Sequence, residues 1–131
     1  GAGNADSGGD GDAATVAAGA AALRRVLVAA CAQDDYFVVA SYSRAGLNQT
    51  GDGHFSPLAA YDAATDSVLI LDVARFKYPP HWVALPLLFA AMTRVDNDTG
   101  RSRGWMVLAR AGSAAAAAIQ HSEGGEGGGG G

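Results

Sequence analysis

The amino-acid sequence predicts an α+β domain in which an antiparallel sheet is flanked by helices. Three observations predict it: a helical spacing of apolar residues over 15–31, several aromatic and β-branched runs of strand length, and two such runs joined by the turn residues 62–66. The chain of 131 residues is one domain at most. Its ends are rich in Gly, Ala, Asp, Glu and Ser, so we expect 1–14 and 112–131 to be disordered around a domain at 15–111.

The first predicted helix spans 15–31 and the first predicted strand spans 36–42. The helix prediction depends on apolar residues that recur at helical spacing, namely Val16, Ala20, Leu23, Leu27 and Ala30. Polar residues at 33–35 end that pattern, and the aromatic and β-branched run at 36–42 is typical of a strand that is buried on both faces.

A glycine-containing loop at 43–53 leads into a predicted hairpin of strands 54–61 and 67–73. A turn loop of three or five residues would make the numbers of opposed residues sum to an even value. His54 and Asp72 would then lie on one face of the sheet within a diagonal step. A four-residue loop would separate them.

The last predicted elements are a helix at 85–93 and a strand at 105–109. Leu85, Leu88, Phe89 and Met92 share one face of that helix, and Pro79-Pro80 before it predicts an extended crossing.

The chemistry of the chain is concentrated at His54 and Asp72. A histidine and a carboxylate on neighbouring strands form the second half of a nucleophilic triad, in which the acid orients the base. A lone histidine beside glycine is more often structural, and the alternative for Asp72 is a structural pair with Arg75, since a carboxylate that closes an apolar run needs a partner.

The net charge of −4 argues against a dedicated nucleic-acid or membrane-surface binder, because such proteins carry a basic excess. We expect no membrane span and a cytoplasmic location. The single cysteine, Cys31, excludes an internal disulfide framework, and the histidines show no ligand spacing for zinc.

The motifs GHFSP at 53–57 and LDVARFKYPPHW at 71–82 closely resemble phytochelatin synthase, the glutathione γ-glutamylcysteinyltransferase family. SYSR at 41–44 and RGWMVLAR at 103–110 extend the resemblance. It implies a papain-like cysteine-proteinase fold and a Cys-His-Asp triad that cleaves glycine from glutathione. The γ-glutamylcysteinyl group then passes through a thioester to glutathione or a growing phytochelatin. No organic cofactor is implied, and heavy-metal ions such as cadmium would serve as activators or as metal–glutathione substrate.

Carried over to this sequence, the resemblance makes His54 the triad histidine and Asp72 its orienting acid. Arg44, Arg75, Lys77 and Tyr78 would bind substrate carboxylates or set the electrostatics of the site. His81, between Pro80 and Trp82, is interpreted as structural.

The family's nucleophile motif is not present in this sequence, which resembles only the second half of the catalytic domain. Cys31 ends its predicted helix, where the helix dipole opposes a thiolate, so we interpret it as non-catalytic. The chain begins at Gly1 rather than Met, and we expect a fragment that is inactive without the N-terminal half. Such a fragment would leave Leu85, Leu88 and segment 76–82 with too little cover. The alternatives are a non-catalytic remnant and a papain-like peptidase of glutathione conjugates.

Overall fold

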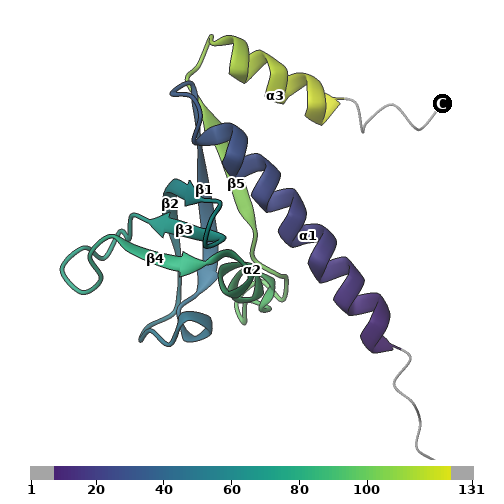
Figure 1. Cartoon of the computed structure of the whole chain (residues 1–131), viewed down its shortest axis with the longest axis vertical. Helices are drawn as coiled ribbons and strands as arrows, with labels where there is room; N and C mark the ends of the chain where they lie inside the picture. Colours follow the sequence, from purple (N-terminus) through teal and green to yellow (C-terminus); the bar gives the residue numbers. More distant parts are fainter. Residues whose placement is uncertain (1–7, 125–131) are drawn as a thin grey trace, which may run out of the picture.

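The computed structural model describes residues 8–124, with side chains from 13 to 119, as one antiparallel sheet and its helices (Figure 1). The strand order is β4-β3-β2-β1-β5, and every neighbouring pair is antiparallel. In chain order the elements are α1 (Gly8–Ala30), β1 (Tyr36–Ser43), the 3-10 helix η1 (Ala45–Leu47), β2 (Gly53–Asp62), β3 (Ser67–Ile70), β4 (His81–Ala84), α2 (Leu85–Thr93), β5 (Trp105–Ala109) and α3 (Ala114–Gly124). The predicted α+β class with an antiparallel sheet is confirmed.

Two helices extend into the segments for which we predicted disorder. Helix α1 begins at Gly8 instead of residue 15, and α3 occupies 114–124 within the alanine-rich end. Alanine has the highest helix propensity of all residues, which favours helix where few apolar side chains can be buried. Residues 1–7 and 125–131 lie outside the described part, so the prediction of disorder stays open for them.

The sequence pattern did not reveal strand β4. It has four residues and pairs antiparallel with β3, with His81 opposite Ile70. The two prolines that precede it cannot donate to a ladder, which suits a position at the edge of a sheet. The extended crossing expected there therefore adds an edge strand.

One face of the sheet forms the core with α1 and α2. The fully buried residues Val38, Ala40 and Tyr42 alternate along β1, and Leu23 and Leu27 of α1 are buried in the same cluster. Close approach of the helices requires Gly19, because a Cβ there would lie 2.4 Å from the ring of Phe89 in α2.

The expectation that Leu85 and Leu88 lack cover was wrong. Both are fully buried, because α2 turns them toward α1 and the sheet. The rest of that expectation agrees with the structure, since Phe76 is fully exposed and Trp82 is about half exposed.

The opposite face of the sheet is apolar and open. Phe37, Phe55 and Leu108 are each more than half exposed there, and Leu71 and Met106 are 40% and 42% exposed. The register places Phe37 opposite Leu108 and Val39 opposite Met106, so these side chains share one face. The helices that build the core thus leave this face uncovered.

Helix α1 also has the length and composition of a membrane span over Ala13–Ala30, contrary to our reading of the sequence. A core helix of a soluble protein passes the same test. Leu23 and Leu27 are fully buried in the core, and Arg24 forms a bidentate pair with Asp66 in the β2–β3 turn. These contacts attach the C-terminal half of α1 to the sheet.

Candidate functional site

A β-bulge decides which residues face one another at the end of the hairpin. The turn joins Asp62 to Ser67 through four residues, the loop length that would have separated His54 from Asp72. The register shifts between Leu58 and Ala60, however, and Leu58 opposes Ile70. This extra residue restores an even sum, so the predicted shared face is reached through a bulge rather than through the loop.

Asp72 lies next to Ser56 and one diagonal step from His54. Continuing the Leu58–Ile70 register places Asp72 opposite Ser56, and the Tyr42 hydroxyl bridges the two, at 3.2 Å from Ser56 Oγ and 3.3 Å from Asp72 Oδ2. Tyr42 itself is paired with His54 across β1 and β2. Tyr42, His54, Ser56 and Asp72 therefore occupy one corner of the core face.

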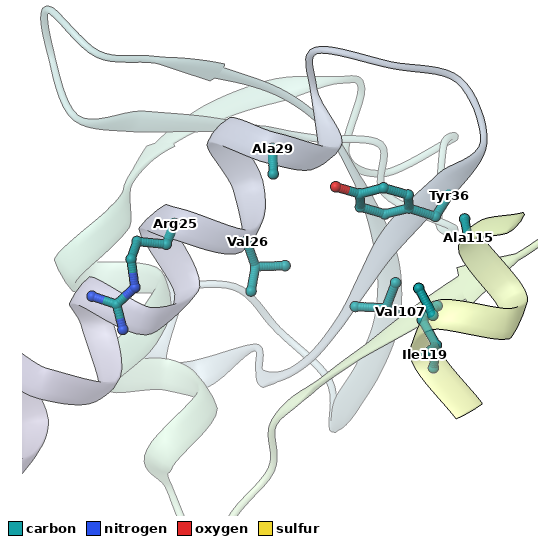
Figure 2. Close-up of a pocket in the computed structure, with 8 residues that line it drawn as sticks. Arg25, Val26, Ala29, Tyr36, Val107, Ala115 and Ile119 are labelled. Atoms are coloured by element: carbon teal, nitrogen blue, oxygen red, sulfur yellow. The ribbon is translucent and has the colours of Figure 1, made fainter. Parts of the chain in front are cut away.

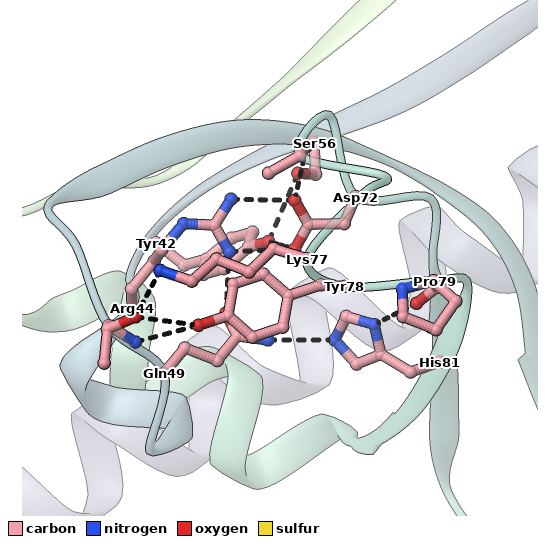
Figure 3. A network of polar contacts seen from close by, with 11 residues as sticks. Tyr42, Arg44, Gln49, Ser56, Asp72, Lys77, Tyr78, Pro79 and His81 are labelled. Carbon is pink, nitrogen blue, oxygen red and sulfur yellow. Dashed lines mark hydrogen bonds and ion pairs between the residues drawn. The ribbon is translucent and has the colours of Figure 1, made fainter.

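The Asp72 carboxylate is fully buried and bound on both oxygens (Figure 3). Arg44 donates from Nη1 to Oδ2 at 2.8 Å and from Nη2 to Oδ1 at 2.7 Å. Oδ1 also accepts the Ala74 backbone N–H at 2.9 Å, and Oδ2 accepts the Tyr42 hydroxyl. A carboxylate has about four acceptor positions, so these four donors fill it.

His54 is exposed and makes no hydrogen bond or ion pair within residues 13–119. The expected contact between its imidazole and the Asp72 carboxylate is therefore not formed. The alternative pairing of Asp72 with Arg75 is not formed either, because the arginine that binds it is Arg44. The acid and the base share a face of the sheet but are not hydrogen-bonded.

The Arg44 pair fixes the charge of Asp72. Hydrogen bonding from Arg44 outweighs the burial of the carboxylate and lowers its pKa from 3.8 to about 2. The same hydrogen bond raises the pKa of Arg44. Both groups are thus ionised at neutral pH, and Asp72 presents a permanent negative charge beside the position of His54.

The structure brings three of the four predicted substrate-binding residues together. Arg44 is 1% exposed, donates to Gln49 at 2.8 Å and has its guanidinium carbon 4.9 Å from the Tyr78 ring centroid. The Tyr78 hydroxyl accepts the Thr50 N–H, and Lys77 donates to the Thr50 hydroxyl. Hydrogen bonding from Thr50 lowers the pKa of Tyr78.

These contacts change the interpretation of the four residues. Asp72 and Gln49 engage Nη1 and Nη2 of Arg44, and the residue is 1% exposed, so its guanidinium is not open to a substrate carboxylate. Arg75 stands apart, exposed and without a partner in the described part of the chain. His81 belongs to the same network, since its Nδ1 lies 2.9 Å from the Pro79 carbonyl and its Nε2 lies 3.4 Å from Gln49 Nε2.

Sequence reasoning missed Arg103 and Asp96, which lie beside the start of β2. A Cβ on Gly53 would lie 1.8 Å from Arg103 Nη1, so the guanidinium lies directly against the residue before His54. Arg103 also pairs with Asp96 at 3.3 Å, and its buried Nε has no hydrogen-bond partner among residues 13–119. The only signal in the sequence was the glycine itself, because Arg103 is fifty residues away along the chain.

Arg103 and Asp96 line a pocket of about 290 Å³ on the open face of the sheet. Its lining also includes Phe55, Trp105, Ser41, Thr99 and Ser102. A cation, an anion and apolar walls in one small pocket are suited to a zwitterionic ligand with an apolar stem.

A second hollow lies between α1, β1, β5 and α3 (Figure 2). It has a volume of about 450 Å³, and its lining is almost wholly apolar, with Val26, Ala29 and Val107 among its residues. Cys31 is exposed after the C-terminal end of α1, although partial desolvation of its sulfur raises the pKa of its thiol. Within the described residues no three His, Cys, Asp or Glu side chains gather as metal ligands.

A family model described as phytochelatin synthase matches residues 12–105. The chain is 51% identical over 88 residues to glutathione gamma-glutamylcysteinyltransferase 3 of Lotus japonicus. This matched stretch covers 67% of the chain and 18% of the relative. It is 52% identical over 88 residues to glutathione gamma-glutamylcysteinyltransferase 2 of Arabidopsis thaliana, a match that covers 67% of this chain and 20% of the relative. It is 40% identical over 86 residues to the glutathione gamma-glutamylcysteinyltransferase of Schizosaccharomyces pombe, a match that covers 66% of this chain and 21% of the relative. The chain thus spans about a fifth of the length of these curated relatives. It belongs to the phytochelatin synthase family.

Proposed function

We propose that this chain supplies the base and the acid of a glutathione γ-glutamylcysteinyltransferase, with His54 as the base and Asp72 as the acid. The observation that carries the proposal is the bulge-corrected register, which places His54 and an ionised, buried Asp72 on one face within a diagonal step. The names of the relatives supply the substrate, glutathione, and the group transferred. We also propose that the complete catalytic domain has a papain-like fold, of which this sheet forms one half.

The proposed reaction has two halves that share His54. The imidazole takes the proton of a cysteine thiol, whose sulfur attacks the cysteinyl carbonyl of glutathione, and it gives that proton to the departing glycine amine. A second glutathione or a phytochelatin then attacks the thioester with its amine, and His54 takes the amine proton and returns it to the thiol. The negative charge of Asp72 stabilises the imidazolium in both halves.

The nucleophilic cysteine is proposed to come from a part of the protein outside this chain. Cys31 is the only thiol of the sequence, and burial raises its pKa instead of favouring the thiolate. It lies at the C-terminal end of a helix, where the dipole also opposes a negative charge. Heavy-metal ions such as cadmium are proposed to enter as complexes of the substrate thiol.

The pocket that Arg103 and Asp96 line is the proposed binding site for the γ-glutamyl end of glutathione. That end carries an α-carboxylate and an α-ammonium group, which match the guanidinium and the carboxylate of the pair. Arg103 lies against Gly53, the residue before His54, but the pocket opens on the face of the sheet opposite His54. The far end of the substrate is therefore proposed to reach the imidazole around the start of β2. Arg44 is excluded from this role by its contacts with Asp72 and Gln49.

The proposal is tested in a chimera in which this chain replaces the matching 88 residues of the Arabidopsis thaliana relative. Given glutathione and cadmium, the chimera should form phytochelatins, with products separated by length. His54→Ala should abolish them, while Asp98→Asn, a change on an exposed turn, should not. A His54→Ala chimera that still forms product would overturn the assignment.

A further inference from the structure

The Tyr42 hydroxyl occupies the position on Asp72 that a histidine would need. Three of the four donors to the carboxylate lie at 2.7 to 2.9 Å, whereas Tyr42 lies at 3.3 Å and is the weakest. Its hydroxyl also has a second partner, Ser56 Oγ at 3.2 Å. Tyr42 can therefore release Oδ2 without leaving its buried hydroxyl unsatisfied.

We propose that Tyr42 and Arg44 are positioning residues that hold Asp72 in two successive states. In the state seen here, Arg44 clamps the carboxylate and Tyr42 fills its remaining acceptor position. In the working state the Tyr42 hydroxyl turns to Ser56, and His54 Nδ1–H donates to Oδ2 in its place. This inference rests on the proposed function, because it concerns how the same acid meets the same base.

The strand register is compatible with an exchange by side-chain rotation. Diagonal neighbours on adjacent antiparallel strands have Cβ atoms roughly 7 Å apart or less, which long and aromatic side chains can span. His54 is exposed and makes no hydrogen bond in the described part of the chain, so a change of rotamer breaks no hydrogen bond. Tyr42 is already opposite His54 in the β1–β2 register.

Arg44 stays in place during the exchange because its own contacts do not involve His54. Its fork binds both oxygens of Asp72, its Nη1 also reaches Gln49, and its guanidinium lies over the Tyr78 ring. The planar fork fixes the plane of the carboxylate, which a lysine ammonium could not do. The carboxylate is thus held at one angle in both states.

Tyr42→Phe tests the exchange in the chain as it exists. Removing the hydroxyl opens one acceptor position on Oδ2, so the His54 Nδ1 proton should become visible downfield in proton NMR spectra, and the ring ¹⁵N shifts should indicate the Nδ1–H tautomer. Tyr61→Phe is the matched control, because it removes a hydroxyl bonded to another aspartate, Asp66. An intact backbone spectrum of Tyr42→Phe with unchanged His54 resonances would overturn the exchange.

Arg44→Lys tests the clamp in the chimera. Loss of the fork should lower kcat for glycine release by about a hundredfold, as a misplacement of about 1 Å does, with KM for glutathione changed less than about twofold. An equal loss through KM would show that Arg44 binds substrate and would overturn its positioning role. These outcomes are separate from the proposed function, which fails only if His54→Ala remains active.

Discussion

Arg44 binds both carboxylate oxygens of Asp72, at 2.8 and 2.7 Å, although the residues are 28 positions apart. Both side chains are almost completely buried, at 2% and 0% exposure. Such a pair leaves a strong charge without a partner when one member is removed. The pair is therefore the structural centre of the candidate site, and several measurable effects depend on it.

Arg44→Gln should lower the free energy of unfolding by about 3 to 5 kcal/mol, because Asp72 would remain buried without its counter-ion. Urea unfolding followed by circular dichroism measures this loss. Arg75→Gln is the control. Arg75 is exposed and has no partner in the part of the chain that the structure describes, so this change should alter stability by no more than about 0.5 kcal/mol. Equal small effects for both variants would contradict the buried pair.

The stability of the chain should fall in acid through Asp72. Its pKa is lowered from 3.8 to about 2 in the folded state, so the carboxylate stabilises the fold above pH 3.8. This contribution, about 2 kcal/mol, should disappear as the pH falls from 3.8 to about 2. Unfolding curves of the chain and of Asp72→Asn across that range measure it, and parallel curves would refute the assignment.

Leu88→Ala should lower the free energy of unfolding by about 2 to 5 kcal/mol, since the Leu88 side chain of α2 is fully buried in the core. The neighbouring Leu87 is 49% exposed and serves as the matched control, with a much smaller loss on the same truncation. Thermal unfolding of the two variants checks the burial. Similar losses of stability in the two variants would instead indicate that α2 packs only loosely against the core.

Gly53→Ala should weaken the binding of glutathione in the chimera. The added Cβ meets Arg103 Nη1 at 1.8 Å and must displace the guanidinium from its place beside Asp96. Losing one charge-assisted hydrogen bond costs about 1.5 to 3 kcal/mol, so the dissociation constant should rise roughly ten- to a hundredfold. Calorimetric titration measures it, and Ala63→Gly, which changes one methyl group on the exposed β2–β3 turn, is the control.

The chain alone should make no phytochelatin from glutathione and cadmium. Its one thiol, Cys31, lies at the wrong end of a helix and has a raised pKa. Product chromatography checks this directly. Product formation that disappears in Cys31→Ser would show that Cys31 is a nucleophile after all.

Much of the fold could be predicted from local sequence. Helix α2 has the predicted bounds of Leu85–Thr93 because four apolar residues mark its buried face, and β5 has the predicted bounds of Trp105–Ala109. Helix α3 was missed because its alanines bury little and leave no apolar periodicity. Propensity alone decides such a segment.

The site was predictable in its residues but not in its contacts. Asp72 was expected to need a partner, and it has one, but the nearby Arg75 was the arginine considered and Arg44 is the one that binds. The bulge beside Ala59 carries no sequence signal, since the shift occurs in a plain Leu-Ala-Ala run. Contacts of this kind depend on register, which periodicity within one strand does not fix.

The most direct test of the account is the rate of the first chemical step, the release of glycine from glutathione, in single turnover of the chimera. If His54 is the base, His54→Gln should slow this step by about 10² to 10⁴. His81→Gln, which alters a histidine bonded to Pro79 and Gln49 in the neighbouring network, should slow it by less than about tenfold. A His54→Gln chimera that releases glycine within a few-fold of the unmodified rate would contradict the central claim.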